Sequence, residues 1–454
     1  MQTTPIAQKE HQPLADYATC VQHEHWTRQQ LEEYQANALH ACRSYAYAHS
    51  PFYQQFHRGL MDRPLHELPV LTKATVMEHF DELVTDREVH LRDIRQYLAG
   101  ADQTKLFLDR YRVTVTSGST GQPGIFLNNR IEGAVAANTF IRGQIWGGIT
   151  SQSRVAAVTS PLPAHVTAQF PVLEVDGKQV PYLQLSTTVP PKVLVEHLNE
   201  WQPDVLIAYP SIASVLTDEY RQGRLHISLK VIFAGGETLT EEMRRRIEGT
   251  WRVKIFNMFG ATESAPVAGE CSFHTGLHLF EDFTIVEVVD ENNRPVPPGQ
   301  VGDKLLLTVL YRRTQPLIRY EVADMVRVST REPCPCGRPF AQLETIVGRT
   351  GEGLHFQTLT GKEEAVSTLQ FETIFDPLPI SGWQIVQEAD GLHIFLLGAL
   401  EELRSEQVLQ SLREFLSRRG LVIPPIEIHR TTDLAKNVTG KTPALISHEK
   451  RSAS

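Results

Sequence analysis

The chain has 454 residues and a net charge of −9, with 41% hydrophobic and 21% charged residues. It lacks the basic stripe of nucleic-acid binders, so we expect no nucleic-acid partner. No window of about 18 apolar residues occurs and the start is polar, so we expect neither a membrane-spanning helix nor a signal peptide. Its five cysteines are an odd number, which argues against a secreted disulfide framework and predicts a cytoplasmic location.

The first part of the chain alternates between helical and strand patterns. Residues 17–47 lack proline and glycine and predict a helical region that ends before Ser50-Pro51. Further on, helical patterns separate short apolar runs, and this alternation predicts a largely parallel sheet covered by helices on both faces. One of these helices is expected to start at Thr240 and to end at Gly249, because both suit helix caps. The four apolar runs are residues 155–158, 205–208, 231–234 and 253–256.

The pattern changes in the last third. Residues 284–289 and 304–310 flank a turn-forming segment and predict a hairpin. Two glycines and a charge interrupt the pattern at residues 348–353, where we expect a domain boundary. The predicted fold class is α/β, with a large N-terminal domain of mostly parallel sheets flanked by helices (1–348) and a small C-terminal α+β domain (349–454).

A loop rich in glycine and hydroxyl side chains, TVTSGSTGQPG at residues 114–124, follows an apolar strand start. Such a loop can aim backbone N–H groups and hydroxyls at phosphate oxygens. It is not a Walker loop, because no Gly-Lys-Ser/Thr follows it. A mobile connection of serine and glycine is the alternative interpretation of the same residues.

Two further segments combine polar side chains with a position where ligands bind. The segment NMFGATE at residues 257–263 follows the predicted strand 253–256, and ligands of open α/β sheets bind beyond the carboxyl ends of strands. Its aromatic ring and carboxylate could stack a base and hold Mg²⁺. The segment PLIRYEVAD at residues 316–324, with Gly348-Arg349 beyond it, could hold a ribose. Each segment alone is also compatible with an ordinary surface ion pair.

The order and spacing of these segments resemble the adenylate-forming enzymes, the superfamily of acyl-CoA synthetases, and within it the phenylacetate–CoA ligase branch. The resemblance covers nearly the whole chain, and it implies a large domain that binds ATP and the acid and a small mobile lid that carries a lysine. The further matching motifs are SPFY (50–53), LPVLTK (68–73), AGGE (234–237), GLH (276–278), CGR (336–338) and GK (440–441).

The resemblance implies a role for each matched residue. Thr262 would contact phosphate, Glu263 would hold Mg²⁺, and Asp324 and Arg349 would bind the ribose hydroxyls. Lys441 would be the mobile lysine that reaches the reacting carboxylate and phosphate. The ATP phosphates would be wrapped by Ser117, Gly118, Ser119, Thr120 and Gly121. The adenine site would be formed by Gly236, Glu237, Phe259, Gly260 and Ala261, with Phe259 against the base.

The sequence departs from the family pattern in two places. The glycine-rich loop often carries a lysine in this superfamily, but Gln122 and Gly124 occupy that neighbourhood here. One cation near the leaving pyrophosphate is therefore missing from the loop. In place of two aspartates after Gly-Arg, the chain has TGEG at residues 350–353, so the hinge residue is expected to be Glu352.

Cysteines and a histidine suggest a structural zinc site. Cys334 and Cys336 lie on a tight turn, and Cys271 and His278 lie upstream. Three cysteines and one histidine form a closed set of zinc ligands. Three reduced cysteines packed together are the alternative. His274 competes for the histidine position, and the resemblance favours His278.

The predicted function is ATP- and Mg²⁺-dependent activation of a small carboxylic acid to its acyl-adenylate, followed by thioester formation with coenzyme A. The alternatives are transfer to a carrier-protein thiol or another acceptor, and a degenerate nucleotide-binding homologue without turnover. The family branch implies an aromatic or arylacetic acid, and a homodimer is one assembly left open. The acid pocket is expected from Tyr209, Pro210, Ser211 and Ala234, with His165 and Phe170 as further candidates.

Overall fold

The computed structural model describes residues 15–100, 103, 105–116, 123–169, 174–175, 177–331 and 333–448. Within these ranges, no helix has the length and apolar character needed to cross a membrane. Two sets of predicted site residues lie outside the described part of the chain. They are Phe170 and the loop residues Ser117, Gly118, Ser119, Thr120 and Gly121.

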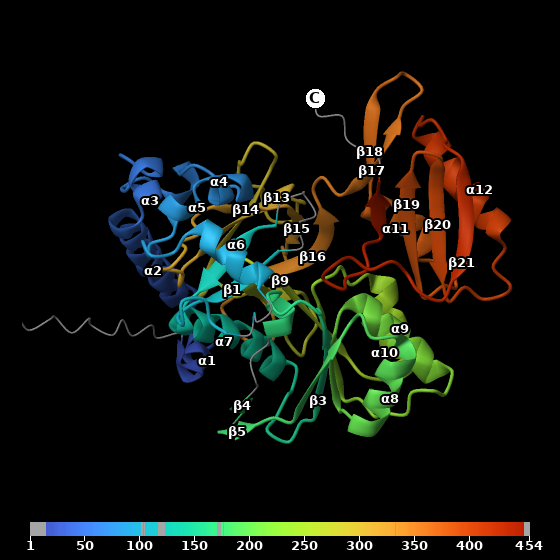
Figure 1. The fold of residues 1–454 in the computed structure, drawn as a ribbon, viewed down its shortest axis with the longest axis horizontal. Helices are drawn as coiled ribbons and strands as arrows, with labels where there is room; N and C mark the ends of the chain where they lie inside the picture. Colours follow the sequence, from blue (N-terminus) through green and yellow to red (C-terminus); the bar gives the residue numbers. More distant parts are fainter. Residues whose placement is uncertain are drawn as a thin grey trace, which may run out of the picture.

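Helices at the start of the chain lie at one end of the molecule (Figure 1). The region predicted as helical holds two helices, because Thr27 caps a new start: its hydroxyl accepts from Gln30 N, and Thr27 N donates to Gln30 Oε1. As predicted, the second of these helices ends before Ser50, and Pro51 opens the next one. The elements are α1 Tyr17–His23, α2 Arg28–His49, α3 Pro51–Phe56, η2 Leu65–Glu67, α4 Lys73–Glu78, α5 Phe80–Leu83 and α6 Leu91–Ala99.

The central sheet has nine strands in the described residues, in the order β15-β16-β11-β10-β9-β8-β7-β3-β6. The strands from β6 to β9 run parallel, as the alternating pattern predicted. From β9 to β15 the neighbours are antiparallel, so the sheet is mixed. Its strands are β3 Val155–Thr159, β6 Tyr182–Ser186, β7 Val205–Ala208, β8 Val231–Gly235, β9 Ile255–Ala261, β10 Ala265–Glu270, β11 Leu277–Leu279, β15 Asp324–Val328 and β16 Gln342–Arg349.

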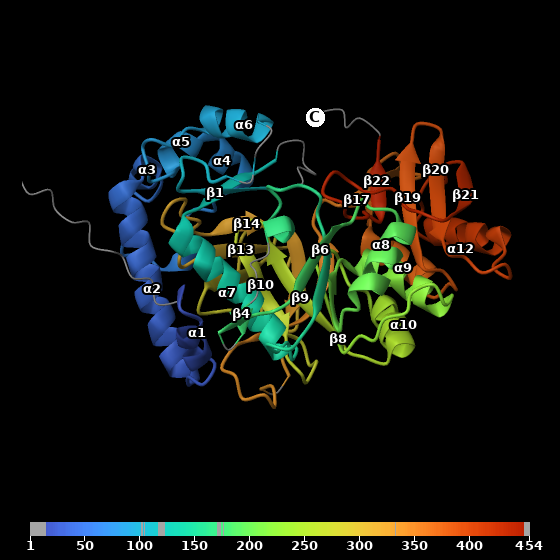
Figure 2. The same ribbon diagram turned by 60° about the horizontal axis from the view of Figure 1, so that its bottom comes forward.

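Helices cover both faces of this sheet. Ala156 and Leu206 pack in the core beneath α8, α9 and α10, whereas Val155 and Val205 point to the opposite face, the side of Ile141 from α7. Figure 2 shows α7 in front of β9 and β10, with the other three helices together beside β8. The helices are α7 Arg130–Trp146, α8 Pro191–Trp201, α9 Pro210–Arg221 and α10 Glu241–Trp251.

Helix α10 starts as predicted but ends later. The Thr240 hydroxyl accepts from Met243 N and caps the start. The predicted end at Gly249 is wrong, because buried Trp251 extends the last turn and donates from its indole to Thr217. Arg252 then takes the left-handed conformation, with φ +60°, that ends the helix.

Smaller sheets complete the large domain. The predicted hairpin is confirmed, since β12 and β13 pair antiparallel from Thr284↔Val309 to Val289↔Lys304. The strands are β1 Arg112–Val115, β2 Ile125–Asn128, β4 Glu174–Val175, β5 Lys178–Gln179, β12 Thr284–Val289, β13 Lys304–Val309 and β14 Tyr320–Val322, with η3 Val166–Gln169 as a short helical turn.

A separate, smaller domain with its own sheet follows β16 and lies above α9 and α10 in Figure 1. Its four-stranded sheet has the order β21-β20-β19-β22, and residues such as Leu354, Ile394 and Leu412 form its own core. Residues 350–352 connect β16 to β17. The elements are β17 Gly353–Gln357, β18 Glu363–Ser367, α11 Thr368–Phe375, β19 Gly382–Glu388, β20 Gly391–Leu397, α12 Ser405–Arg418, β21 Ile426–Thr431 and β22 Leu445–Ser447.

Candidate active site

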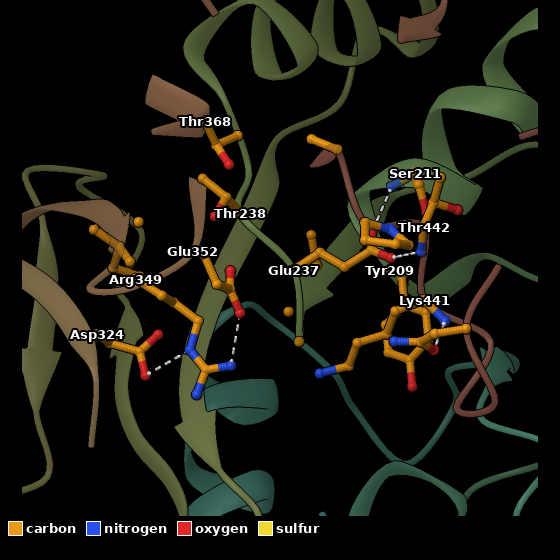
Figure 3. A pocket seen from close by; sticks show the side chains of 18 of the residues that line it. Tyr209, Ser211, Glu237, Thr238, Asp324, Arg349, Glu352, Thr368, Lys441 and Thr442 are labelled. Atoms are coloured by element: carbon orange, nitrogen blue, oxygen red, sulfur yellow. Dashed lines mark hydrogen bonds and ion pairs between the residues drawn. The ribbon is translucent and has the colours of Figure 1, made fainter. Parts of the chain in front are cut away.

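A cavity of about 1310 Å³ lies between the large domain and the small domain, and Figure 3 shows part of its lining. This volume exceeds that of a typical pocket for one small ligand, so it can hold a nucleotide together with an acid. Of the predicted pocket residues, Pro210 is not among those that line it, because it occupies the buried first turn of α9. The predicted residues that line it are His165, Tyr209, Ser211, Ala234, Gly236, Glu237, Phe259, Gly260, Ala261, Thr262, Glu263, Asp324, Arg349 and Lys441.

Glu237 links the two domains at one wall of the cavity. Its carboxylate accepts a hydrogen bond from Ser211 N at 3.1 Å in the large domain and from Thr442 N at 2.7 Å in the small domain. Burial raises the pKa of Glu237, while these hydrogen bonds and nearby Lys441 oppose the shift. Glu237 therefore fixes the backbone next to Lys441, in addition to lying in the predicted adenine region.

Lys441 extends from a tight turn of the small domain. Asn437 Oδ1 accepts from Lys441 N at 3.1 Å and shapes this turn. The Lys441 Nζ lies 5.9 Å from the centroid of the Tyr209 ring (Figure 3). Gly236 makes room for it, since a Cβ there would lie 3.0 Å from Tyr209 Cε1 and 3.7 Å from Lys441 Cε. Burial lowers the pKa of Lys441 and Glu237 raises it, so the ammonium is partly desolvated next to a carboxylate.

Asp324 and Arg349 form the opposite wall. They are register partners on β15 and β16, and Arg349 Nε lies 3.6 Å from Asp324 Oδ2. Arg349 Nη1 also donates to Glu352 Oε1 at 3.1 Å. Burial raises the pKa of Asp324 to about 6, an effect that Arg349 opposes and Glu352 and Glu263 strengthen. At neutral pH a carboxylate and a guanidinium therefore face the cavity, which is a suitable pair for two adjacent hydroxyls.

The NMFGATE segment, predicted to follow a strand, lies largely within one. Residues 257–261 continue β9 instead of leaving it as a loop, so Phe259 is only 8% exposed and reaches the cavity from within the sheet. The turn comes at Thr262 and Glu263, which enter the cavity between two antiparallel strands. Tyr320 Oη donates to Glu263 Oε1 at 3.0 Å and orients this carboxylate.

Lys73 is a cavity residue that the motif analysis did not assign to the site. It opens α4 and lines the cavity. Burial lowers the pKa of its ammonium, while the nearby Glu263 carboxylate raises it. The matched motif LPVLTK contains this lysine, and this match was the signal that could have identified it.

A polar chain lies behind Lys441. Tyr209 Oη and His165 Nδ1 each lie 2.9 Å from Thr167 Oγ1. Burial, with a contribution from Lys441, lowers the pKa of His165 to about 3, so its imidazole is neutral at physiological pH. His165 thus lines the cavity as an uncharged polar group, beside the rings and aliphatic side chains expected to surround the acid.

A second cluster lies away from the cavity and brings together Cys271, His278, Cys334 and Cys336, whose ligand atoms are all within 4.8 Å of one another. The Cys271 and Cys334 sulfurs are 3.6 Å apart, and Cys336 Sγ is 3.4 Å from His278 Nε2. Ligands of one tetrahedral zinc ion are about 3.5–3.8 Å apart, whereas a disulfide needs about 2 Å. The donor set therefore fits zinc.

The protonation states in this cluster also suit a metal. Burial lowers the pKa of His278 to about 4, and its Nδ1 donates to Phe340 O, which leaves Nε2 facing the sulfurs. Burial raises the pKa of Cys271 to about 12, so this thiol stays protonated unless a cation lies next to it. His274 is elsewhere: it pairs with Glu270 at 3.3 Å and packs on Phe256.

Known proteins resemble this chain in sequence. A phenylacetate-coenzyme A ligase of Thermus thermophilus is 26% identical over 391 residues, which cover 80% of each chain. A phenylacetate-coenzyme A ligase of Escherichia coli is 27% identical over 261 residues, covering 54% of this chain and 56% of that protein.

Solved structures resemble it in fold. The 2-hydroxyisobutyryl-CoA ligase in the postadenylation state, in complex with 2-HIB-AMP, superposes with a TM-score of 0.72 at 19% identity, covering 94% of this chain and 91% of that one. The same ligase in the thioesterification state gives a TM-score of 0.60 at 21% identity, again covering 94% of this chain and 91% of that one.

The AMP-binding enzyme family matches residues 74–307, just over half of the chain. This range holds the glycine-rich loop, the Glu237 region and the Thr262–Glu263 turn, and it confirms the resemblance to adenylate-forming enzymes that the motifs indicated. The chain belongs to the family of AMP-binding enzymes.

Proposed function

We propose that this protein activates a small carboxylic acid with ATP to give an acyl-adenylate and then transfers the acyl group to coenzyme A. The observation that carries the proposal is the position of Lys441. Its ammonium lies inside the cavity, next to Tyr209 and Gly236 of the large domain, opposite Asp324 and Arg349. A cation held there is suited to neutralise charge that develops between a carboxylate and an α-phosphate.

In the first half-reaction, the acid's carboxylate attacks the α-phosphorus and pyrophosphate leaves. Positioning and charge neutralisation supply most of the catalysis in such a transfer. Asp324 and Arg349 would hold the ribose, and Lys441 would contact the reacting oxygens. Glu263, oriented by Tyr320, is the residue suited to hold Mg²⁺, which would offset the phosphate charge.

The second half-reaction requires a path for the thiol. We propose domain 1–348 as the adenylation domain and 349–454 as the lid, with residues 350–352 as the hinge between β16 and β17. Withdrawal of Lys441 by rotation about this hinge would open the cavity. The higher TM-score against the postadenylation state than against the thioesterification state of the similar ligase supports an adenylation arrangement in this structure.

We propose an aryl or arylacetic acid as the substrate. The phenylacetate ligases similar in sequence favour such an acid, and the cavity offers Phe140, Tyr209 and Phe233 as neighbours for a ring. The similar 2-hydroxyisobutyryl-CoA ligase has a small branched acid in its name, so aliphatic hydroxy acids belong in the same screen.

We also propose that zinc occupies the site of Cys271, His278, Cys334 and Cys336 and has a structural role. Four protein ligands leave no open position for a substrate. The cluster is largely buried and ties β11 to the segment before β16.

The test follows pyrophosphate release from Mg·ATP with a panel of acids, and then offers coenzyme A or a holo carrier protein as the acceptor. We expect release that depends on an aryl acid, and a thioester with coenzyme A. Thioester formation only on the carrier protein would refute the proposed acceptor, and absence of acid-dependent release would favour a homologue without turnover.

Lys441→Ala should lower acyl-adenylate formation about 100- to 1,000-fold, while thioester formation from a supplied acyl-adenylate continues.

A further inference from the structure

The small domain has an outer face that the mechanism does not use. Strands β20 and β21 run parallel, with His393 beside Glu427 and Phe395 beside His429. Their alternate residues, such as Ile394 and Ile428, pack into the domain core. The four named polar and aromatic side chains therefore share the opposite face of the sheet. None of them lines the cavity that holds Lys441.

Three atoms on this face have the spacing of metal ligands. His393 Nδ1 lies 3.2 Å from His429 Nε2 and 3.7 Å from Glu427 Oε2, and His429 Nε2 lies 3.6 Å from that same oxygen. The point equidistant from the three atoms is about 2.0 Å from each, which is the usual length of a zinc–nitrogen or zinc–oxygen bond. A single ion can therefore contact all three without movement of the backbone.

A second, independent feature orients one of these ligands. His393 Nε2 lies 3.1 Å from Asp390 Oδ1, on the side of the ring away from His429. A histidine that binds metal through one nitrogen typically donates its other N–H to a carboxylate, which fixes the ring and the tautomer. Asp390 supplies such a carboxylate, so that His393 Nδ1 presents a lone pair toward His429 Nε2, where an ion would replace the hydrogen bond between the two rings.

The second imidazole is held by packing. The His429 ring stacks on Phe395, with the centroids 4.9 Å apart and the planes inclined by 23°, and it also stacks on His393. Both rings thus have fixed orientations before any ion arrives. Glu427 is the adaptable ligand, with a side chain that is 67% exposed.

We propose that His393, Glu427 and His429 form a divalent metal site on the outer face of the small domain, separate from the cysteine cluster. Two imidazoles and one carboxylate suit zinc and its neighbours in the first transition row. Three protein ligands leave a fourth position, and water can reach it because the side chains of Glu427 and His429 are 67% and 37% exposed. The site takes a zinc ion together with a water molecule or an external ligand.

The test counts zinc ions per chain by competition with a chromophoric chelator. The full-length protein should bind one more ion than His429→Ala, and Glu427→Gln should also weaken this ion. Asp390→Asn should keep the site but weaken it about 10- to 100-fold, because the carboxylate acts through His393. His90→Ala is the matched control, since among the described residues His90 pairs with the single carboxylate of Asp81, at 3.2 Å, and it should bind as many ions as the original protein.

Cobalt separates the two classes of site on the same chain. An ion held by His393, Glu427 and His429 gives no thiolate charge-transfer band, whereas an ion in the cysteine cluster does. We expect His429→Ala to lose only cobalt without that band. Equal zinc uptake by the original protein and His429→Ala would overturn the proposal. So would loss of the ion from Asp390→Asn together with its retention by His429→Ala and Glu427→Gln, because the ion would then lie on the other nitrogen of His393.

Discussion

Gly440→Ala tests whether docking of the small domain, and not only the Lys441 side chain, supports the first half-reaction. Gly440 has φ +79° and lies against the large domain next to the lysine. A Cβ at this position would collide with Thr187 Oγ1, and it would lie 3.0 Å from Thr187 Cβ and 3.2 Å from Pro161 Cδ. Thr187 is fully buried in the large domain, so it has little room to move.

Two costs follow from this substitution. The left-handed conformation costs about 1–2 kcal/mol for a residue with a Cβ, and this cost falls on the small domain itself. The collision adds about 1–3 kcal/mol, as overpacking does, and this cost falls only on the docked arrangement. Acyl-adenylate formation should therefore fall about 5- to 150-fold from the collision. Thioester formation from a supplied acyl-adenylate should change less than about twofold, since the proposed lid rotation gives it another arrangement of the domains.

Gly420→Ala is the matched control. Gly420 has φ +68° in the same domain, but nothing lies within 4 Å of the Cβ that alanine would add. It should lower the stability of the domain without a selective effect on adenylate formation. Adding Thr187→Ala to Gly440→Ala should restore part of the activity, because it removes the colliding hydroxyl. If Gly440→Ala and Gly420→Ala slowed both half-reactions equally, the assignment of this loop to the docked arrangement would be wrong.

Three further predictions concern single groups. Lys73→Ala should lower kcat/KM for Mg·ATP in pyrophosphate release about 10- to 100-fold. The reason is that the glycine-rich loop lacks a lysine, and Lys73 supplies a cation near Glu263 in its place. A rate equal to that of the original protein would refute this role. Burial raises the pKa of Asp324 from its ordinary 3.8 to about 6, so the folded state binds this proton more tightly than the unfolded state does. The proton on Asp324 therefore stabilises the fold fully only below pH 4, and this contribution is lost as the pH rises through 6. The original protein should therefore lose about 3 kcal/mol relative to Asp324→Asn between pH 3 and 7 in chemical denaturation without ATP, and parallel curves would contradict it. Removal of zinc from the cysteine cluster, or Cys334→Ser, should lower the Tm by at least about 5 °C while the KM for ATP of the folded protein stays the same; an unchanged Tm would argue for plain packing of reduced cysteines.

The sequence predicted elements whose signals are local. Thr240 caps α10, and α2 ends before Ser50-Pro51, because both signals act within one helical turn. The end of α10 was wrong since it depends on Trp251 reaching Thr217, a tertiary contact that no cap pattern contains. Likewise, residues 257–261 continue β9 because β10 pairs with them, and an apolar pattern does not reveal that partner.

The same distinction holds for the site. Motif order identified the residues on both walls of the cavity, because each motif is a short segment with its own chemistry. The link from Glu237 to Thr442 joins residues far apart in the sequence, and it could not be read from either motif alone. The face formed by His393, Glu427 and His429 depends on the parallel register of β20 and β21, so its residues carry no signal until the strands are paired.

The interface between the domains suits the proposed entry and withdrawal of Lys441. The apolar cores of the two domains fall in separate clusters, with no shared member among the described residues. Contacts across the interface include hydrogen bonds from Ser214 and Arg246 to Ser381, and one from Lys436 to Thr187 O. Each such bond contributes only about 0.5–1.5 kcal/mol net, or up to about 3 where a charge takes part, because water replaces it on separation. Polar contacts therefore hold the lysine in the position seen in this structure, and the proposed withdrawal costs less than separating a shared hydrophobic core would.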